Sequence, residues 1–204
     1  MTLQDCLDLL FDVKSVSMAT VDENGAPQVR IIDLMLNENG TLYFCTARGK
    51  DFYRQLMRTG RVAMTAMNDH WQTVRLSGRV KRLDDQTYWI DRIFDANASI
   101  ANLYKGDRRY VLEAFCLATA DVEFFDLSTE PIDRASFSLG GAFIGMKGFH
   151  ITDACIGCGQ CASVCPQNCI SPGTPYAIAP AHCLHCGLCA ETCPAGAIER
   201  LGER

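Results

Sequence analysis

The C-terminal quarter of the chain carries eight of its twelve cysteines in two copies of one pattern. Each copy reads C-x2-C-x2-C-x3-C-P, once from Cys155 to Pro166 and again from Cys183 to Pro194. The copies stand 28 residues apart and also match at apolar and glycine positions. A module of about 55 residues has too little apolar core to fold on burial alone, so groups held by these thiols must add the missing stability.

This spacing is the one by which two cubane 4Fe–4S clusters are held, with the fourth cysteine of each run ligating the other cluster. Crossed ligation predicts two sets of four ligands. They are Cys155, Cys158, Cys161 and Cys193 for the first cluster, and Cys183, Cys186, Cys189 and Cys165 for the second. Because such clusters move single electrons, the pattern predicts a redox function.

Two other uses of the cysteines fit the spacing less well. Structural zinc favours paired C-x2-C hooks without a third closely spaced cysteine, and disulfides need an oxidising compartment. Cys169 falls opposite Ala197 in the repeat, which favours a small buried side chain over a ligand. The three cysteines outside the runs, Cys6, Cys45 and Cys116, show no ligand spacing and are expected to be ordinary core or strand residues.

Composition excludes two classes of function. The net charge of −5 argues against a nucleic-acid-binding protein, and no apolar stretch approaches the ~20 residues of a membrane span. Twelve cysteines without a secretion signal at the start of the chain favour the reducing cytoplasm.

The cysteines also suggest how the chain is divided. We expect a first domain over residues 1–135, a glycine-rich connecting segment over 136–149 that packs rather than moves freely, and an iron–sulfur domain over 150–204. A chain of 204 residues has room for one ordinary domain and one small one.

The first domain shows the alternation of apolar and polar residues that is typical of half-buried strands. Asn-Gly pairs at 24–25 and 39–40 separate the first three strands, which is a strong hairpin signal. Short-linked antiparallel strands with two helices favour a closed or split β-barrel. The predicted strands are 15–21, 28–36, 41–46, 61–67, 72–83 and 111–127, and the predicted helices are 50–59 and 84–104.

Four segments of this domain resemble a known family. They read P-Q-V-R-I-I-D-L (27–34), L-Y-F-C-T-A-R-G-K (42–50), R-V-A-M-T-A (61–66) and T-V-R-L-S-G-R-V (73–80). Their order and spacing resemble the pyridoxamine 5′-phosphate oxidase-like, FMN-binding split barrel over roughly residues 5–128. The implied fold is mainly β with helices (α+β), a split antiparallel barrel followed by a small ferredoxin-like iron–sulfur domain.

The resemblance implies a site for FMN, whose phosphate needs cations and hydrogen-bond donors. The family's phosphate-binding positions correspond to Arg30, Thr46 and Lys50, and Arg48 offers a further cation. The flavin ring would meet the backbone near Ile31, Ile32 and Cys45, and Trp71 and Thr73 would complete the cleft from the same chain or a partner subunit. Taken singly, these cations could equally be solvated strand and turn charges.

The sequence also departs from pyridoxamine 5′-phosphate oxidase itself. Met35 stands where that enzyme has a lysine, and its C-terminal arginine–histidine segment has no counterpart here. Oxidation of vitamin B6 is therefore not expected. The family resemblance implies a homodimer.

A flavin beside two clusters forms a short electron-transfer chain. The leading prediction is an FMN-dependent oxidoreductase that takes electrons from a ferredoxin-like donor and reduces a small organic acceptor. A non-catalytic electron carrier or redox sensor is the alternative, and a deazaflavin or haem ligand is another. No dinucleotide-binding G-x-G-x-x-G motif follows a strand, so a separate donor protein is expected rather than NAD(P)H.

Overall fold

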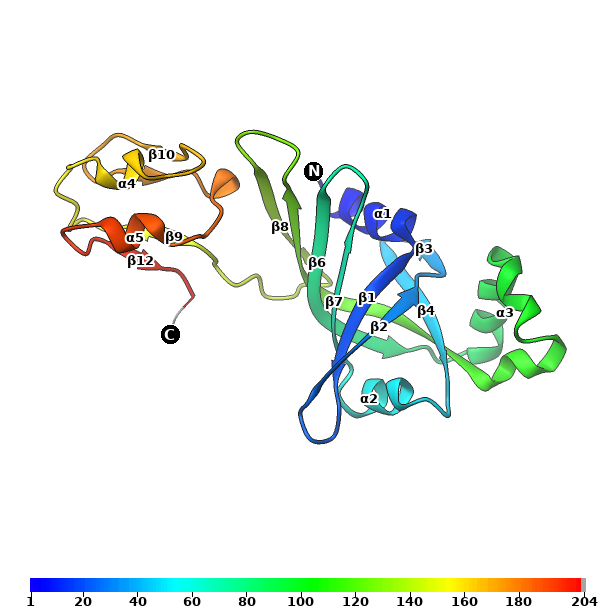
Figure 1. Cartoon of the computed structure of the whole chain (residues 1–204). Helices are drawn as coiled ribbons and strands as arrows, with labels where there is room; N and C mark the ends of the chain where they lie inside the picture. The colour runs from blue at the N-terminus through cyan, green and yellow to red at the C-terminus, as the bar shows by residue number, and fades with distance from the viewer. Residues whose placement is uncertain (203–204) are drawn as a thin grey trace. The chain divides into compact units, whose positions relative to one another are not determined.

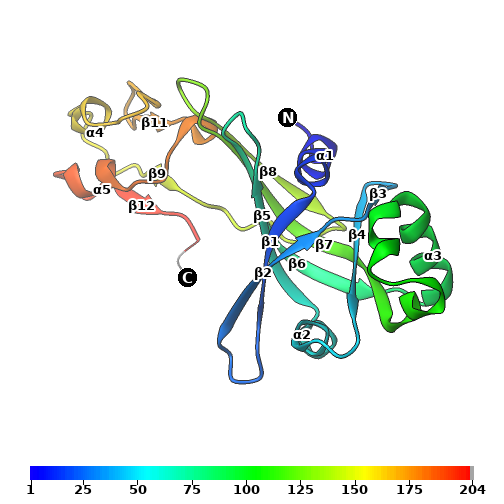
Figure 2. The ribbon, with the colours of Figure 1, turned by 45° about the vertical axis from the view of Figure 1, so that its right-hand side comes forward.

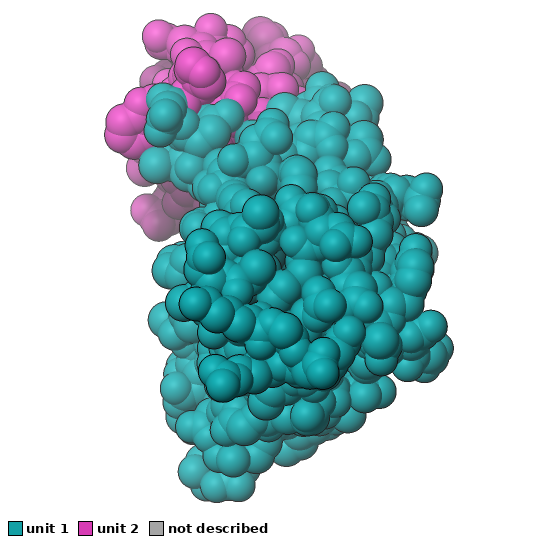
Figure 3. Space-filling model, turned by 90° about the vertical axis from the view of Figure 1, so that its right-hand side faces the viewer, with its two compact units in different colours: residues 1–69, 73–123, 136–143 teal, residues 70–72, 124–135, 144–204 magenta. Residues whose placement is uncertain are grey.

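The computed structural model describes residues 1–202 and divides the chain into two compact units, which Figure 3 colours separately. Unit 1 consists of residues 1–69, 73–123 and 136–143. Unit 2 consists of residues 70–72, 124–135 and the chain from 144 onwards. Residues 124–135, which the sequence assigns to the first domain, thus group with the cysteine-rich part. Within the described residues, no helix combines the length and apolar character that crossing a membrane requires.

One curled antiparallel sheet of eight strands forms the frame of unit 1 (Figure 1). Its strands are β1 (Ser15–Val21), β2 (Pro27–Asp33), β3 (Leu36–Glu38), β4 (Thr41–Ala47), β5 (Arg61–Met67), β6 (Gln72–Arg82), β7 (Leu112–Asp126) and β8 (Asp133–Leu139). They follow the order β2-β1-β5-β6-β7-β4-β3, and β8 pairs with β7. The strict alternation of burial along β1 and β5 confirms the predicted strand periodicity. The predicted split barrel is therefore the fold that forms.

Three helices pack on this sheet: α1 (Leu3–Val13), α2 (Asp51–Thr59) and α3 (Gln86–Ala96). Figures 1 and 2 both show α1 and α2 near opposite ends of the curled sheet. Thr2 begins α1 with a capping box to Asp5, and Asp85 caps α3 by accepting from the Tyr88 backbone. Two short 3-10 segments, Ala98–Asn102 and Gly106–Val111, follow α3.

Several predicted elements are shorter in the structure, and two were not predicted. The single strand expected over 28–36 divides, because Leu34 N donates to Lys14 O and Met35 N donates to Tyr43 O. The helix expected over 84–104 stops before Asn97, whose side chain donates to the carbonyls of Met35 and Ile93. Neither α1 nor β8 was predicted from the sequence, and β8 includes the first four residues of the expected connecting segment.

Unit 2 repeats one small motif around its cysteines. Its elements are β9 (Phe149–Ile151), α4 (Gln160–Ser163), β10 (Ile170–Ser171), β11 (Ala177–Ile178), a 3-10 turn (Pro180–His182), α5 (Leu188–Thr192) and β12 (Ile198–Arg200). Antiparallel pairing joins β9 to β12 and β10 to β11, so strands from the two halves interleave. Gly159 and Gly187 precede α4 and α5 in the left-handed conformation that glycine adopts readily. The sequence repeat is thus also a structural repeat.

Candidate functional site

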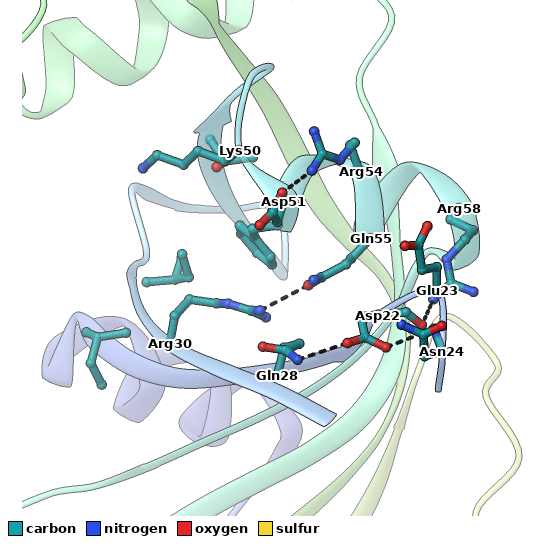
Figure 4. Close-up of a pocket in the computed structure, with 14 residues that line it drawn as sticks. Asp22, Glu23, Asn24, Gln28, Arg30, Lys50, Asp51, Arg54, Gln55 and Arg58 are labelled. Atoms are coloured by element: carbon teal, nitrogen blue, oxygen red, sulfur yellow. Dashed lines mark hydrogen bonds and ion pairs between the residues drawn. The ribbon is translucent and has the colours of Figure 1, made fainter. Parts of the chain in front are cut away.

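An open cavity of about 800 Å³ lies in unit 1 between β2, the end of β4 and the start of α2 (Figure 4). Its volume is within the range of small-molecule sites. Five of the residues predicted to hold FMN line it, namely Arg30, Ile31, Ile32, Thr46 and Lys50. The fold therefore brings together side chains from three separate parts of the sequence.

Arg30 is held in place by a hydrogen-bond network that the sequence did not reveal. Its guanidinium donates to Thr20 Oγ1 at 2.6 Å and to Gln55 Oε1 at 3.0 Å, and Thr20 Oγ1 donates to Gln55 Oε1 at 2.5 Å. The guanidinium also lies 4.6 Å from the centre of the Phe52 ring. Burial lowers the pKa of Arg30 from its usual value. This arginine is thus oriented before any ligand arrives.

Thr46 and Lys50 provide the other features of an anion site. The Thr46 side chain is buried, and its hydroxyl has no hydrogen-bond partner among residues 1–202. Lys50 is exposed, and its ammonium makes no hydrogen bond or ion pair within that range. Lys50 is also the N-cap of α2 and gives the helix no side-chain cap, which leaves first-turn N–H groups available to an anion. A buried orphan hydroxyl beside a free cation fits a phosphate.

The two other arginines of the cavity already have partners. Arg54 forms an ion pair with Asp51, and Arg58 donates to the carbonyls of Val21 and Asp22. The Asp22 carboxylate also accepts from Gln28, as the dashed lines in Figure 4 show. Lys50 is therefore the positive group best placed for a ligand, and Arg30 lines the same cavity with hydrogen-bond partners that are all neutral.

Four predicted site residues do not line this cavity. Arg48 donates to Tyr110 O at 2.6 Å and lies 3.7 Å from the Glu113 carboxylate. The Cys45 side chain packs in the apolar cluster under α3, and burial raises its pKa to about 12. Trp71 is 61% exposed in the β5–β6 turn, and Thr73 pairs with Met67 beside that turn. Their flavin contacts, from this chain or a partner, stay predictions.

Unit 2 contains two small cavities, each lined by one of the predicted sets of four cysteines. One cavity is lined by Cys155, Cys158, Cys161 and Cys193, and the other by Cys165, Cys183, Cys186 and Cys189. Each set thus surrounds a small hollow. This arrangement fits two polynuclear clusters with crossed ligation.

The surroundings of both cavities also suit clusters. Backbone N–H groups point at cysteine sulfurs at equivalent positions, from Gly157 to Cys155 at 3.5 Å and from His185 to Cys183 at 3.4 Å. Isoleucines and a tyrosine pack around the buried cysteines, which limits access of water. Hydrogen bonds to sulfur and exclusion of water are the means by which proteins set cluster potentials.

The β7–β8 hairpin also contacts the cysteine loops inside unit 2. Its buried residue Ile132 donates its N–H to Gln167 Oε1 at 2.9 Å, and its carbonyl lies 2.8 Å from His182 Nδ1. Arg134 of the same hairpin contacts the ring of His185. No short-range sequence pattern could have revealed these contacts, because they join residues 35 to 51 positions apart.

Comparison with solved structures identifies the fold of unit 1. A NimC/NimA family protein from Clostridium acetobutylicum matches 67% of this chain and 92% of its own, with 24% identity and a TM-score of 0.57. A C. acetobutylicum protein related to general stress protein 26 of B. subtilis matches 66% and 94%, with 14% identity and a TM-score of 0.50. A haem-binding protein from Mycobacterium smegmatis matches 67% and 58%, with 16% identity and a TM-score of 0.50.

Comparison with curated proteins found no match. Comparison with protein families matches each of two segments of the chain to a known family. Residues 154–197 match the 4Fe-4S dicluster domain, and residues 3–123, more than half of the chain, match pyridoxamine 5′-phosphate oxidase. A flavin-binding type of domain joined to a 4Fe–4S domain indicates electron transfer. The chain belongs to the pyridoxamine 5′-phosphate oxidase family and carries a 4Fe–4S dicluster domain at its C-terminal end.

Proposed function

We propose that this protein is an FMN-dependent oxidoreductase in which two 4Fe–4S clusters pass electrons to the flavin, which then reduces a small organic acceptor. The observation that carries this proposal is the grouping of Arg30, Thr46 and Lys50 around one open cavity, in a chain that also forms two cavities lined by the predicted cluster ligands. Bound FMN would exchange electrons singly with the clusters and in pairs with an organic molecule.

The chain's own residues would select and orient the flavin. Arg30, already fixed by Thr20 and Gln55, and the ammonium of Lys50 would neutralise the phosphate, while the orphan hydroxyl of Thr46 donates to one of its oxygens. Ile31 and Ile32 on edge strand β2 line the same cavity and would contact the ring system. The opening of the cavity leaves a route for a small acceptor.

The electron balance requires a partner. Each turnover takes two electrons from two molecules of a reduced one-electron donor of ferredoxin type and two protons from solvent. An acceptor such as a quinone or a conjugated enone receives both electrons and both protons. We further propose that the protein is a homodimer, as the family resemblance implies, and that it works in the reducing cytoplasm that suits twelve free cysteines.

The test is an anaerobic preparation of the whole protein. We expect about eight iron and eight sulfide per chain and one FMN, with reduction of the flavin by a reduced ferredoxin and saturable reoxidation by an acceptor of a quinone and enone panel. Full cofactor content without any saturable acceptor would favour the carrier or sensor. A haem spectrum, a deazaflavin spectrum, or zinc without acid-labile sulfide would contradict the cofactor assignment.

A further inference from the structure

The cavity of the second predicted cluster is lined by five cysteines, one more than the cluster needs as ligands. Cys169 is 8% exposed and lines this cavity together with Cys165, Cys183, Cys186 and Cys189. Its Sγ lies 3.5 Å from the Sγ of Cys165. A buried thiol this close to a predicted ligand can donate a hydrogen bond to the ligand sulfur as well as fill space.

The internal repeat supplies a direct comparison. Cys165 and Cys193 are the fourth cysteines of their runs, and the residues four positions later are Cys169 and Ala197. Ala197 is also buried, at 1% exposure, and its N–H donates to Cys193 Sγ at 3.3 Å. The two halves therefore differ in the buried side chain that follows the fourth cysteine by four positions, a thiol in one and a methyl group in the other.

The direction of the side-chain bond follows from ligation. A cysteine bound to iron has lost its proton, so in the pair Cys165–Cys169 the S–H of Cys169 is the donor. Reduction adds one negative charge to a cluster, and a hydrogen bond to a ligand sulfur stabilises that added charge. The bond therefore favours the reduced form of the second cluster over its oxidised form.

We propose that Cys169 raises the reduction potential of the second cluster above that of the first, so that electrons from the donor occupy the second cluster first. The two clusters would then differ in potential because a thiol, Cys169, lies beside the second and a methyl group, Ala197, lies at the equivalent position beside the first. This inference rests on the proposed presence of clusters but is independent of the acceptor.

The test compares the full-length protein with Cys169→Ala and Cys169→Ser, each prepared anaerobically and titrated with dithionite while electron paramagnetic resonance and visible absorbance are recorded. Cys169→Ala should lower the equilibrium constant for reduction of one cluster roughly tenfold. For a one-electron couple this corresponds to a reduction potential lower by about 59 mV. The other cluster should keep its potential. Cys169→Ser retains a donor and should stay at or above the wild-type value.

The reciprocal variant Ala197→Cys should raise the potential of the first cluster and bring the two potentials together. Iron and sulfide analysis separates the possible failures. Wild-type protein without clusters would contradict the proposed function itself. Assembled clusters with unchanged potentials in Cys169→Ala would overturn the tuning role, and so would loss of the second cluster from that variant, since Cys169 would then be a ligand.

Discussion

At the scale of single residues, Arg30 shows how far a sequence can lead. The family resemblance predicts that Arg30 binds a phosphate. Taken alone, the residue is equally consistent with a solvated charge on a strand. The structure places the guanidinium between Thr20, Gln55 and the Phe52 ring. These partners are 10 to 25 residues away along the chain, so no local pattern predicts them. A cation fixed in this way loses little entropy when an anion binds.

The first prediction concerns the proposed phosphate site. Removing the charge of Lys50 or Arg30 with Lys50→Ala or Arg30→Ala deletes a charge-assisted contact worth about 1.5–3 kcal/mol. The affinity for FMN should fall about tenfold to a hundredfold, as measured by fluorescence titration of the apoprotein. The affinity for riboflavin, which lacks the phosphate, should not change. Equal binding of FMN and riboflavin by the unaltered protein would refute the phosphate site.

The second prediction concerns the residue that orients Arg30. Gln55→Leu keeps the size of the side chain but removes the acceptor of both Thr20 and Arg30. We expect FMN affinity to fall about tenfold with riboflavin affinity unchanged, because only the phosphate contact depends on the guanidinium. Gln28→Leu is the matched control, since Gln28 lines the same cavity but bonds Asp22 instead. A loss shared by both flavins would indicate a general structural role for Gln55.

At the scale of elements, the strands with alternating burial were predicted well, and the elements set by tertiary contacts were not. β5 has the predicted bounds, whereas β3 exists only because Leu36–Glu38 pairs with Thr41–Tyr43. β8 was missed because its second half runs directly into Gly140 and Gly141, and the glycine-rich stretch suggested a connecting segment. The N-terminal helix α1 could have been predicted, because the capping box of Thr2 and Asp5 precedes an amphipathic run.

The third prediction concerns the close approach of β6 and β7. A Cβ at Gly78 would lie 2.1 Å from the carbonyl oxygen of Thr119 and 2.8 Å from the Cβ of Ala120. Gly78→Ala must therefore push the two strands apart, which costs about 1–3 kcal/mol or more. Gly49→Ala is the control, because nothing lies within 4 Å of its Cβ. Urea unfolding followed by circular dichroism should show a lower midpoint for Gly78→Ala alone.

The fourth prediction tests the crossed arrangement of the two cysteine runs. Cys193 belongs to the second run by sequence but lines the first cavity with Cys155 and Cys158. Cys193→Ser should therefore damage the cluster of the first run and leave that of Cys183, Cys186 and Cys189 intact. Iron analysis with electron paramagnetic resonance should report about half of the iron and one remaining set of signals. Loss confined to the other cluster would show that ligation is not crossed.

At the scale of the whole molecule, the two parts of the chain differ in what stabilises them. Unit 1 buries an extended apolar core between its curled sheet and helices, whereas the buried core of the cysteine-rich part consists largely of cysteines. The cysteine-rich part should therefore depend on its clusters for order, while the barrel should not. This difference means that the two halves of the proposed relay can be separated experimentally without dividing the chain.

The last prediction uses this separation. In the double variant Cys158→Ser/Cys186→Ser, one ligand of each cluster is lost from an exposed position. We expect the variant to retain FMN with wild-type affinity, because the residues that line the proposed flavin cavity all belong to unit 1. Reduced ferredoxin should no longer support turnover, since in the proposed relay its electrons enter through the clusters. Flavin reduced directly by dithionite should still be reoxidised by the acceptor at the normal rate. If ferredoxin-driven turnover persisted in this variant, electrons would reach the flavin by another route, and the clusters would not be the relay.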